Sequence, residues 1–252
     1  MKHYEQLVDM GCFSLADVTA ITGNQDTARS LLYAYRKRGL IESVRRDLYV
    51  AMSFETKQPV PNRYAIAAKT ADGAYVSHHS AFEVHGVANQ VYYEVYVASE
   101  KRFSSFEFDG VSYMRIAPSI SEGVVKLPNG VRVTDIERTV LDSIRDFEKI
   151  GGLEETLNCI GLIPRLDESK LLAYLSEYGN GYLYQRAGYI LRSSDAMFAL
   201  SDRFFADCQD KIPKSKRYLY QGLQAEPHTL DRDWLLFVPE NLTKGDIHGD
   251  DV

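Results

Sequence analysis

The sequence predicts an α+β fold, in which an N-terminal winged helix-turn-helix is followed by a mixed α+β domain with a mainly helical C-terminal part. Near the N-terminus, two helical periodicities are separated by a Gly-Asn turn and followed by a basic hairpin. The middle of the chain alternates β-branched and aromatic runs with hairpin dipeptides, and helical spacing dominates after about residue 150. Because 252 residues exceed the usual size of one domain, we expect domains at 1–58 and 62–252, with room for a subdivision near residue 150.

The helix expected at residues 25–38 has one apolar stripe and one polar face. Its apolar residues recur at i, i+3, i+4 and i+7 and should face a core: Ala28, Leu31, Leu32 and Tyr35. The opposite side is polar, with Arg29 and Arg36 flanking the stripe and these residues pointing away from it: Asp26, Ser30, Tyr33 and Lys37. Such a face can meet a phosphate backbone and base edges, as a recognition helix does.

The ends of the two helices also fit a helix-turn-helix. Ser14 with Asp17 three residues later predicts a capped helix start, and residues 2–10 predict a helix before it. Gly23-Asn24 provides the short turn between the helices. Gly39 followed by an apolar residue is the usual left-handed end of the second helix.

A hairpin is expected at residues 41–50, with Arg45-Arg46-Asp47 at its middle, and we interpret it as a wing. Basic residues dominate from Thr27 to Val50, whereas the whole chain has a formal net charge of −6. A basic excess confined to one module is typical of a DNA-binding module. Double-stranded DNA is therefore the expected partner, with base edges read near the start of the helix. The residues expected to contact DNA are Gln25, Thr27, Arg29, Ser30, Tyr33, Arg36, Lys37, Arg45 and Arg46.

The region after the hairpin predicts strands joined by tight turns. Lys57 to Pro61 interrupts regular structure, and residues 63–70 predict a short helix. Residues 91–98 have the composition of a half-buried strand, whose alternation places Tyr93, Val95 and Val97 in the core and leaves Tyr92 and Tyr96 as a candidate partner-binding face. Asp109-Gly110 and Asn129-Gly130 predict turns between further strands. The alternation alone leaves both core packing and partner contact open for the tyrosines.

Several helix signals lie in the remainder of the chain. Ser77 is expected to cap a helix that ends at Gly86, and residues 134–137, Thr-Asp-Ile-Glu, form a capping-box pattern. Asp167 should cap another helix, and a further helix is expected at residues 182–191. The late predicted features are a basic connector at 211–220, an edge strand or packed segment at 234–238, and an acidic end whose last residues we expect to be disordered.

Composition and spacing argue against several other classes of protein. No apolar run approaches a membrane span and the start lacks a secretory apolar core, so we expect a cytoplasmic protein with no membrane partner. Cys12, Cys159 and Cys208 lack metal-site spacing, and His78 and His85 lack the i, i+4 pairing of a helical zinc site. We therefore expect no metal, no cofactor and no catalytic residue. The Glu-x-Lys triplets at 55–57 and 168–170 do not lie on a strand beside an upstream aspartate, which argues against a nuclease.

Three stretches of the chain carry a family resemblance: the winged-helix start, residues 75–86 with Ser-Ala-Phe-Glu-x-His-Gly, and residues 131–142 with Glu-Arg-Thr-x-x-Asp. Together they resemble the AbiEi-type antitoxins of abortive-infection (type IV) toxin–antitoxin systems. The resemblance covers roughly residues 5–210. It implies that the N-terminal domain represses its own operon through inverted repeats in the promoter. It also implies that the C-terminal domain counteracts a nucleotidyltransferase-like toxin, directly or indirectly.

The leading hypothesis is therefore a non-enzymatic antitoxin and transcriptional autorepressor that functions in phage defence. The alternative is a winged-helix transcription regulator whose second domain senses a small ligand and has no toxin partner. For the string Glu137-Arg138 with Asp142, the simplest interpretation is charge pairing within one helix that also tethers neighbouring strands.

Overall fold

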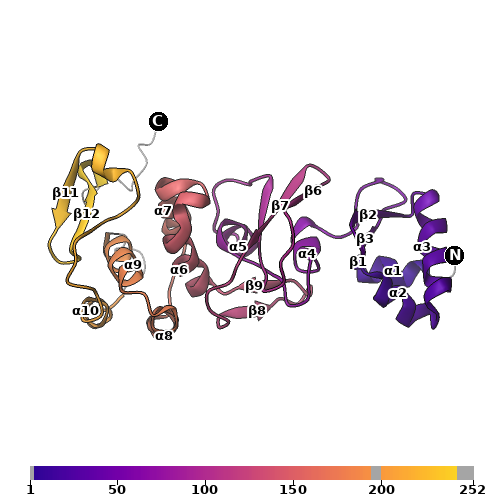
Figure 1. The fold of residues 1–252 in the computed structure, drawn as a ribbon, viewed down its shortest axis with the longest axis horizontal. Coiled ribbons are helices and arrows are strands. Elements are labelled where there is room, and N and C mark those ends of the chain that lie inside the picture. Colours follow the sequence, from indigo (N-terminus) through magenta and orange to yellow (C-terminus); the bar gives the residue numbers. More distant parts are fainter. Residues whose placement is uncertain (1–2, 194–199, 243–252) are drawn as a thin grey trace. The chain divides into compact units, whose positions relative to one another are not determined.

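The computed structural model describes residues 3–193 and 200–242, and it confirms a mixed α+β architecture (Figure 1). The chain divides into two compact units. The first comprises residues 1–76, 92–118 and 126–133, and the second comprises 77–91, 119–125 and 134–252. The predicted boundary between residues 58 and 62 lies inside the first unit and stays a prediction. The predicted disorder of the last few residues lies outside the described part of the chain.

The N-terminal part of the first unit contains three helices and a small sheet. The helices are α1 (Tyr4–Met10), α2 (Leu15–Thr22) and α3 (Gln25–Lys37). The sheet has the order β1-β3-β2, from β1 (Cys12–Phe13), β2 (Ile41–Arg45) and β3 (Leu48–Ala51). The predicted helix at 25–38 and hairpin at 41–50 are thus present, with a register shift between Ser43 and Arg45.

Local hydrogen bonds explain where these helices begin and end. Ser14 and Asp17 form a reciprocal capping box at the start of α2, as predicted. Gly23 ends α2 at a φ of 74°, a left-handed conformation that suits glycine. Asn24 then begins α3, because its side chain accepts hydrogen bonds from the backbone of Asp26 and Thr27.

A six-stranded sheet has the strand order β6-β7-β5-β4-β9-β8. Its strands are β4 (Tyr75–Val76), β5 (Glu94–Ala98), β6 (Phe106–Phe108), β7 (Val111–Ile116), β8 (Val124–Lys126) and β9 (Arg132–Thr134). The β5–β7 and β4–β9 pairs are parallel. The predicted Asp109-Gly110 hairpin is confirmed, since both residues have positive φ and join the antiparallel β6 and β7. A short helix, α4 (Arg63–Ala67), precedes β4.

The predicted burial of Tyr93 and the predicted exposure of Tyr96 are both wrong. Tyr93 is 79% exposed, whereas Tyr96 is 7% exposed. The strand begins only at Glu94, so the alternation does not extend back to Tyr93. Four consecutive residues of β5 are buried because this strand lies between β7 and β4 and both of its faces are covered. Tyr96 is therefore a core residue rather than a candidate for partner binding.

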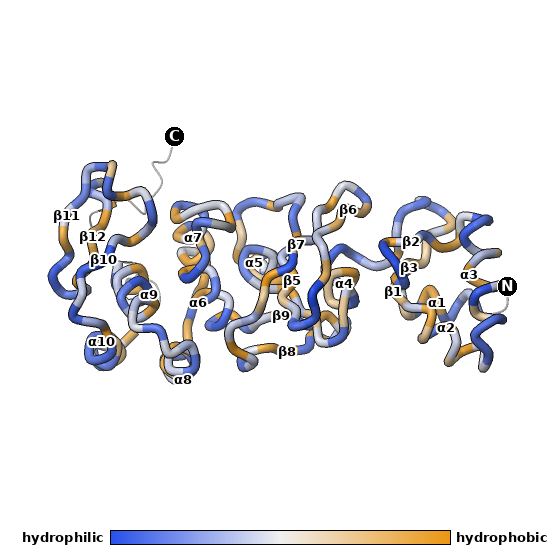
Figure 2. Tube along the Cα trace, in the orientation of Figure 1, coloured by the Kyte–Doolittle hydropathy of each residue, from blue (hydrophilic) through white to orange (hydrophobic). Residues whose placement is uncertain are grey.

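The second unit is mainly helical. Its helices are α5 (His78–His85), α6 (Ile136–Asp146), α7 (Gly152–Gly161), α8 (Glu168–Tyr178), α9 (Gly181–Ser193) and α10 (Asp202–Gln209). Helix α6 buries eight of its eleven residues and lies within the large apolar core. The predicted helices at 167 onward and 182–191 are confirmed, and Figure 2 shows hydrophobic and hydrophilic residues alternating along the helical segments.

Three local predictions in the second unit are corrected. Asp135, not Thr134, caps α6, because Thr134 ends strand β9 and its hydroxyl contacts Thr139. Ser77 precedes α5, but its hydroxyl hydrogen-bonds His78 Nδ1 instead of capping the helix. The strand β12 (Leu236–Pro239) is not an edge strand, since it lies between β10 (Arg217–Tyr218) and β11 (His228–Asp231). The sequence did not indicate either of these two neighbouring strands.

Within the described residues, no helix has both the length and the apolar character that crossing a bilayer requires.

Candidate nucleic-acid interface

The outward face of α3 is fully available to a partner. All seven α3 residues predicted to contact DNA are exposed, and they are Gln25, Thr27, Arg29, Ser30, Tyr33, Arg36 and Lys37. The stripe behind them is buried, with Ala28 at 0% and Leu32 and Tyr35 at 5% exposure. Tyr33 is 71% exposed, although large aromatic residues are usually at least partly buried. The sequence periodicity thus separated the two faces of this helix correctly.

At the start of α3, the positive charge of Arg29 is partly balanced by a neighbouring carboxylate. Asp26 Oδ1 lies 3.6 Å from Arg29 Nη1, and both side chains are mostly exposed. Thr27 Oγ1 is 3.4 Å from the capping oxygen of Asn24. The positive charge of the helix therefore concentrates toward its C-terminal end, at Arg36 and Lys37.

Arg45 does not lie at a free hairpin tip. Its guanidinium carbon is 5.1 Å from the ring centre of Phe103 and 5.4 Å from that of Phe106. Asp47, with a φ of 59°, accepts a hydrogen bond from the backbone of Leu15, which fixes the turn. Arg46 is exposed. The structure therefore groups Arg45 with two aromatic side chains.

A cleft of about 980 Å³ opens in the first unit beside this hairpin. Seven basic side chains line it, whereas its acidic residues are Asp17, Asp47 and Asp72. The basic residues are Arg45, Arg46, Lys69, Lys101, Arg102, Lys126 and Arg132. Lys101 forms an ion pair with Asp72, which lowers the pKa of that carboxyl group. The sequence does not indicate this basic cleft, because its residues come from segments that are far apart in the chain.

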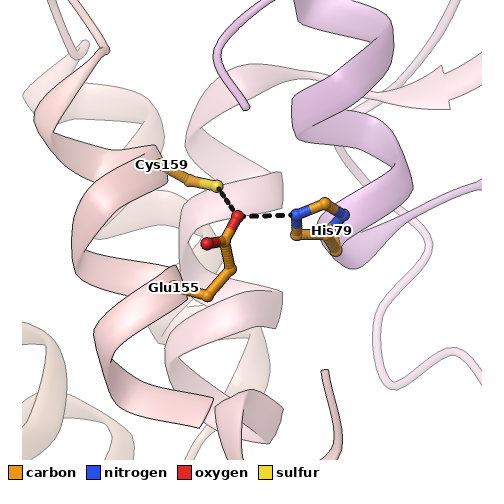
Figure 3. Close-up of side chains that lie close together, drawn as sticks. All are labelled: His79, Glu155 and Cys159. Carbon is orange, nitrogen blue, oxygen red and sulfur yellow. Dashed lines mark hydrogen bonds and ion pairs between the residues drawn. The ribbon is translucent and has the colours of Figure 1, made fainter. Parts of the chain in front are cut away.

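The histidine-containing segment forms a buried polar cluster, not a surface. His79 Nε2 lies 2.9 Å from Glu155 Oε1 (Figure 3). On the other side of the ring, His79 Nδ1 lies 3.0 Å from Glu83 Oε1. The thiol of Cys159 donates to the same oxygen of Glu155 at 3.4 Å. Burial and the neighbouring carboxylate both raise the pKa of the Cys159 thiol. His85 contacts the carbonyl oxygen of Thr134 at 2.7 Å.

His78 lies in a second polar contact near the end of α6. Its Nε2 is 3.4 Å from Asp146 Oδ2, which also accepts from Arg145 Nη2 at 2.7 Å. Burial alone would raise the pKa of Asp146. The hydrogen bonds from His78 and Arg145 outweigh this effect and hold that pKa below its ordinary value.

The Glu-Arg-Thr-x-x-Asp string is a buried network centred on α6. The predicted pairing is present, with Arg138 Nε 2.9 Å from Asp142 Oδ2. Arg138 is 1% exposed, and its Nη1 donates to the carbonyl oxygen of Glu122 at 2.6 Å. On the helix facing it, Tyr178 donates to Asp142. This string therefore fastens segments of the second unit to one another.

The start of α6 adds further members to that network. Lys170 Nζ lies 3.1 Å from Asp135 Oδ2 and 3.2 Å from Glu137 Oε2. Tyr174 donates to Asp135 Oδ2 at 2.7 Å. Lys170 belongs to the 168–170 triplet, and these contacts give its ammonium group a structural partner on α6.

No protein-family model matches the chain, and no curated protein matches it. The fold is similar to the crystal structure of the RV2827C protein from Mycobacterium tuberculosis. The alignment covers 94% of this chain and 92% of that chain, with a TM-score of 0.59 and 14% sequence identity. At this identity the likeness concerns the fold alone.

Proposed function

We propose that the chain is a DNA-binding repressor and antitoxin, whose residues 1–58 act as a winged helix-turn-helix. The observation that carries the proposal is the two-sided character of α3. Its apolar stripe is buried, and its outward face presents Gln25, Ser30, Arg36 and Lys37 to solvent. A helix that follows a short turn and presents such a face can enter a major groove.

At DNA, the basic side chains would contact phosphates and displace condensed counterions, so the affinity should fall as salt rises. Gln25, Thr27 and Ser30 lie near the start of α3, where side chains reach base edges in related docking geometries. Arg46 is the more accessible of the two hairpin arginines, because Arg45 is already packed on Phe103. Inverted promoter repeats would be read by two copies of the module.

The antitoxin half of the proposal is supported by the resemblance of residues 75–86 and 131–142 to AbiEi-type antitoxins. In this proposal, residues 62–252 form the domain that counteracts a nucleotidyltransferase-like toxin. No enzymatic activity is assigned to this chain.

Two readouts in one strain test the proposal. A reporter driven by the promoter of the chain's own operon measures repression, and co-expression with the product of the neighbouring gene measures growth rescue. We expect Arg36→Ala with Lys37→Ala to relieve repression and keep rescue. Lys214→Ala, an exposed basic residue of the second unit, is the matched control and should keep both. A pair of α3 substitutions that leaves repression intact would refute the assignment.

A transcription regulator that senses a small ligand is the second candidate, and the basic cleft favours it. Its volume of about 980 Å³ is in the range of small-molecule sites, and its lining suits an anion. The two candidates differ in growth rescue, since a ligand sensor without a toxin partner would give none.

A further inference from the structure

We propose that His79, Glu155 and Cys159 form a binding site for a divalent transition-metal ion, with zinc as the best match. Their ligand atoms, one nitrogen, one oxygen and one sulfur, all lie within 4.8 Å of one another. Protein zinc sites use these three donor types. Neither the isolated cysteines nor the histidine spacing predicted this site. It lies wholly in the second unit and is independent of the proposed DNA binding.

The three donors are held by two helices. Helix α7 carries Glu155 and Cys159 at i, i+4 spacing, which places both side chains on one face. Helix α5 carries His79, whose ring points at the same carboxylate oxygen (Figure 3). All three residues are buried, with exposures of 1% for His79, 5% for Glu155 and 0% for Cys159. The donor atoms therefore converge inside the unit rather than on its surface.

Glu83 has the position expected of a group that orients a metal-bound histidine. Its Oε1 lies 3.0 Å from Nδ1 of His79, on the side of the ring away from Glu155. Metal-binding histidines commonly donate their second ring N–H to a carboxylate, which fixes the tautomer and the ring orientation. Nε2 would then be the atom that binds the metal.

The competing explanation is a metal-free hydrogen-bonded cluster, and metal analysis of the full-length protein separates the two. We expect about one equivalent of zinc after purification without chelators. Titration of the metal-stripped protein with Co²⁺ should give a thiolate-to-cobalt charge-transfer band. Cys159→Ser should lose the band, whereas the matched controls Cys12→Ser and Cys208→Ser, which replace the other buried thiols, should keep it.

Glu83→Gln and Glu155→Gln complete the test if Cys159→Ser fails to fold. Glu83→Gln should keep the charge-transfer band and weaken Co²⁺ binding about 10–100-fold, because it alters only the orienting group. Glu155→Gln should reduce binding further, since an amide is a poorer ligand. Substoichiometric metal with no cobalt band in the wild type, or an equal band in Cys159→Ser, would overturn the proposal.

Discussion

The outward face of α3 and the network around α6 use the same kinds of side chain in opposite surroundings. On α3, Arg36 and Lys37 are exposed. Around α6, Arg138 is 1% exposed and its guanidinium is fixed by Asp142 and by a backbone carbonyl. An ion pair in water contributes little to stability, whereas breaking a buried pair is costly. The more distinctive sequence string therefore marks a structural network, and the less distinctive basic helix is the candidate for binding.

The largest expected effect follows from removing the central cation of the α6 network. Arg138→Met leaves Asp142 buried without its guanidinium partner, and we expect a loss of about 3–5 kcal/mol in the free energy of unfolding. Urea denaturation measures it. Arg36→Met on α3 is the matched control and should stay within about 0.5 kcal/mol of the wild type. Equal losses in the two variants would remove the distinction between the regions.

Two glycines with the same φ, one exposed beside α3 and one packed against α6, test the contrast between these regions. Gly23 and Gly123 both have a φ of 74°, but a Cβ at Gly23 would meet nothing within 4 Å. A Cβ at Gly123 would lie 2.8 Å from Cβ of Arg138 and 2.9 Å from Cζ of Tyr174. Gly23→Ala should cost about 1–2 kcal/mol for the left-handed conformation, and Gly123→Ala about 1–3 kcal/mol more for overpacking. Thermal denaturation that ranks Gly23→Ala as the worse variant would contradict the packing described here.

Asp146 gives a pH-dependent version of the comparison. Although burial opposes its ionisation, hydrogen bonds from His78 and Arg145 hold its pKa below 3.8 in the folded protein. Ionised Asp146 thus stabilises the folded protein at pH values above the unfolded-state pKa of this carboxyl group. This stabilisation is lost as pH falls through its lower folded-state pKa. We expect Asp146→Asn to cost about 2 kcal/mol at neutral pH, with a difference from the wild type that shrinks below about pH 4. A difference that is constant with pH would show that the ionised carboxylate is not responsible.

The smallest stability effect is expected at the hairpin, where the two arginines should behave differently. Arg45→Ala removes the packing on Phe103 and Phe106 and should destabilise the protein by about 1 kcal/mol. Arg46→Ala should leave stability unchanged and weaken DNA binding, because that side chain is exposed. Chemical denaturation combined with a DNA titration separates the outcomes. If the two variants behaved identically in both assays, the contacts of Arg45 with Phe103 and Phe106 would not give it a different role from Arg46.

Local signals in the sequence predicted most helices and turns. Ser14 with Asp17, Gly23-Asn24 and Asp109-Gly110 each specify a local conformation, through hydrogen bonds between a side chain and the nearby backbone or through a positive φ. The same signals placed the cap of α6 one residue early, because Thr134 is held by the strand β9. Tyr93 was misplaced because periodicity cannot show where a strand starts.

Features assembled from distant segments could not be predicted in this way. His79 meets Glu155 and Cys159 only because α5 and α7 come together in the fold, and the i, i+4 pair on α7 does not by itself show that a histidine lies opposite it. The aromatic partners of Arg45 lie far from it in the sequence, since Phe103 is in the loop after β5 and Phe106 begins β6. The exposed face of α3 could be predicted, since it depends only on the period of one helix.

The salt dependence of DNA binding tests the central claim most directly. Affinity for the promoter repeats would be measured by fluorescence anisotropy across a series of salt concentrations, for the wild type and for Arg36→Ala with Lys37→Ala. We predict weaker binding and a shallower plot of log affinity against log salt, with a slope smaller by roughly one unit for each phosphate that the variant no longer neutralises. Lys214→Ala should match the wild type. Wild-type and α3-variant plots that superimpose would contradict the assignment of DNA binding to this helix.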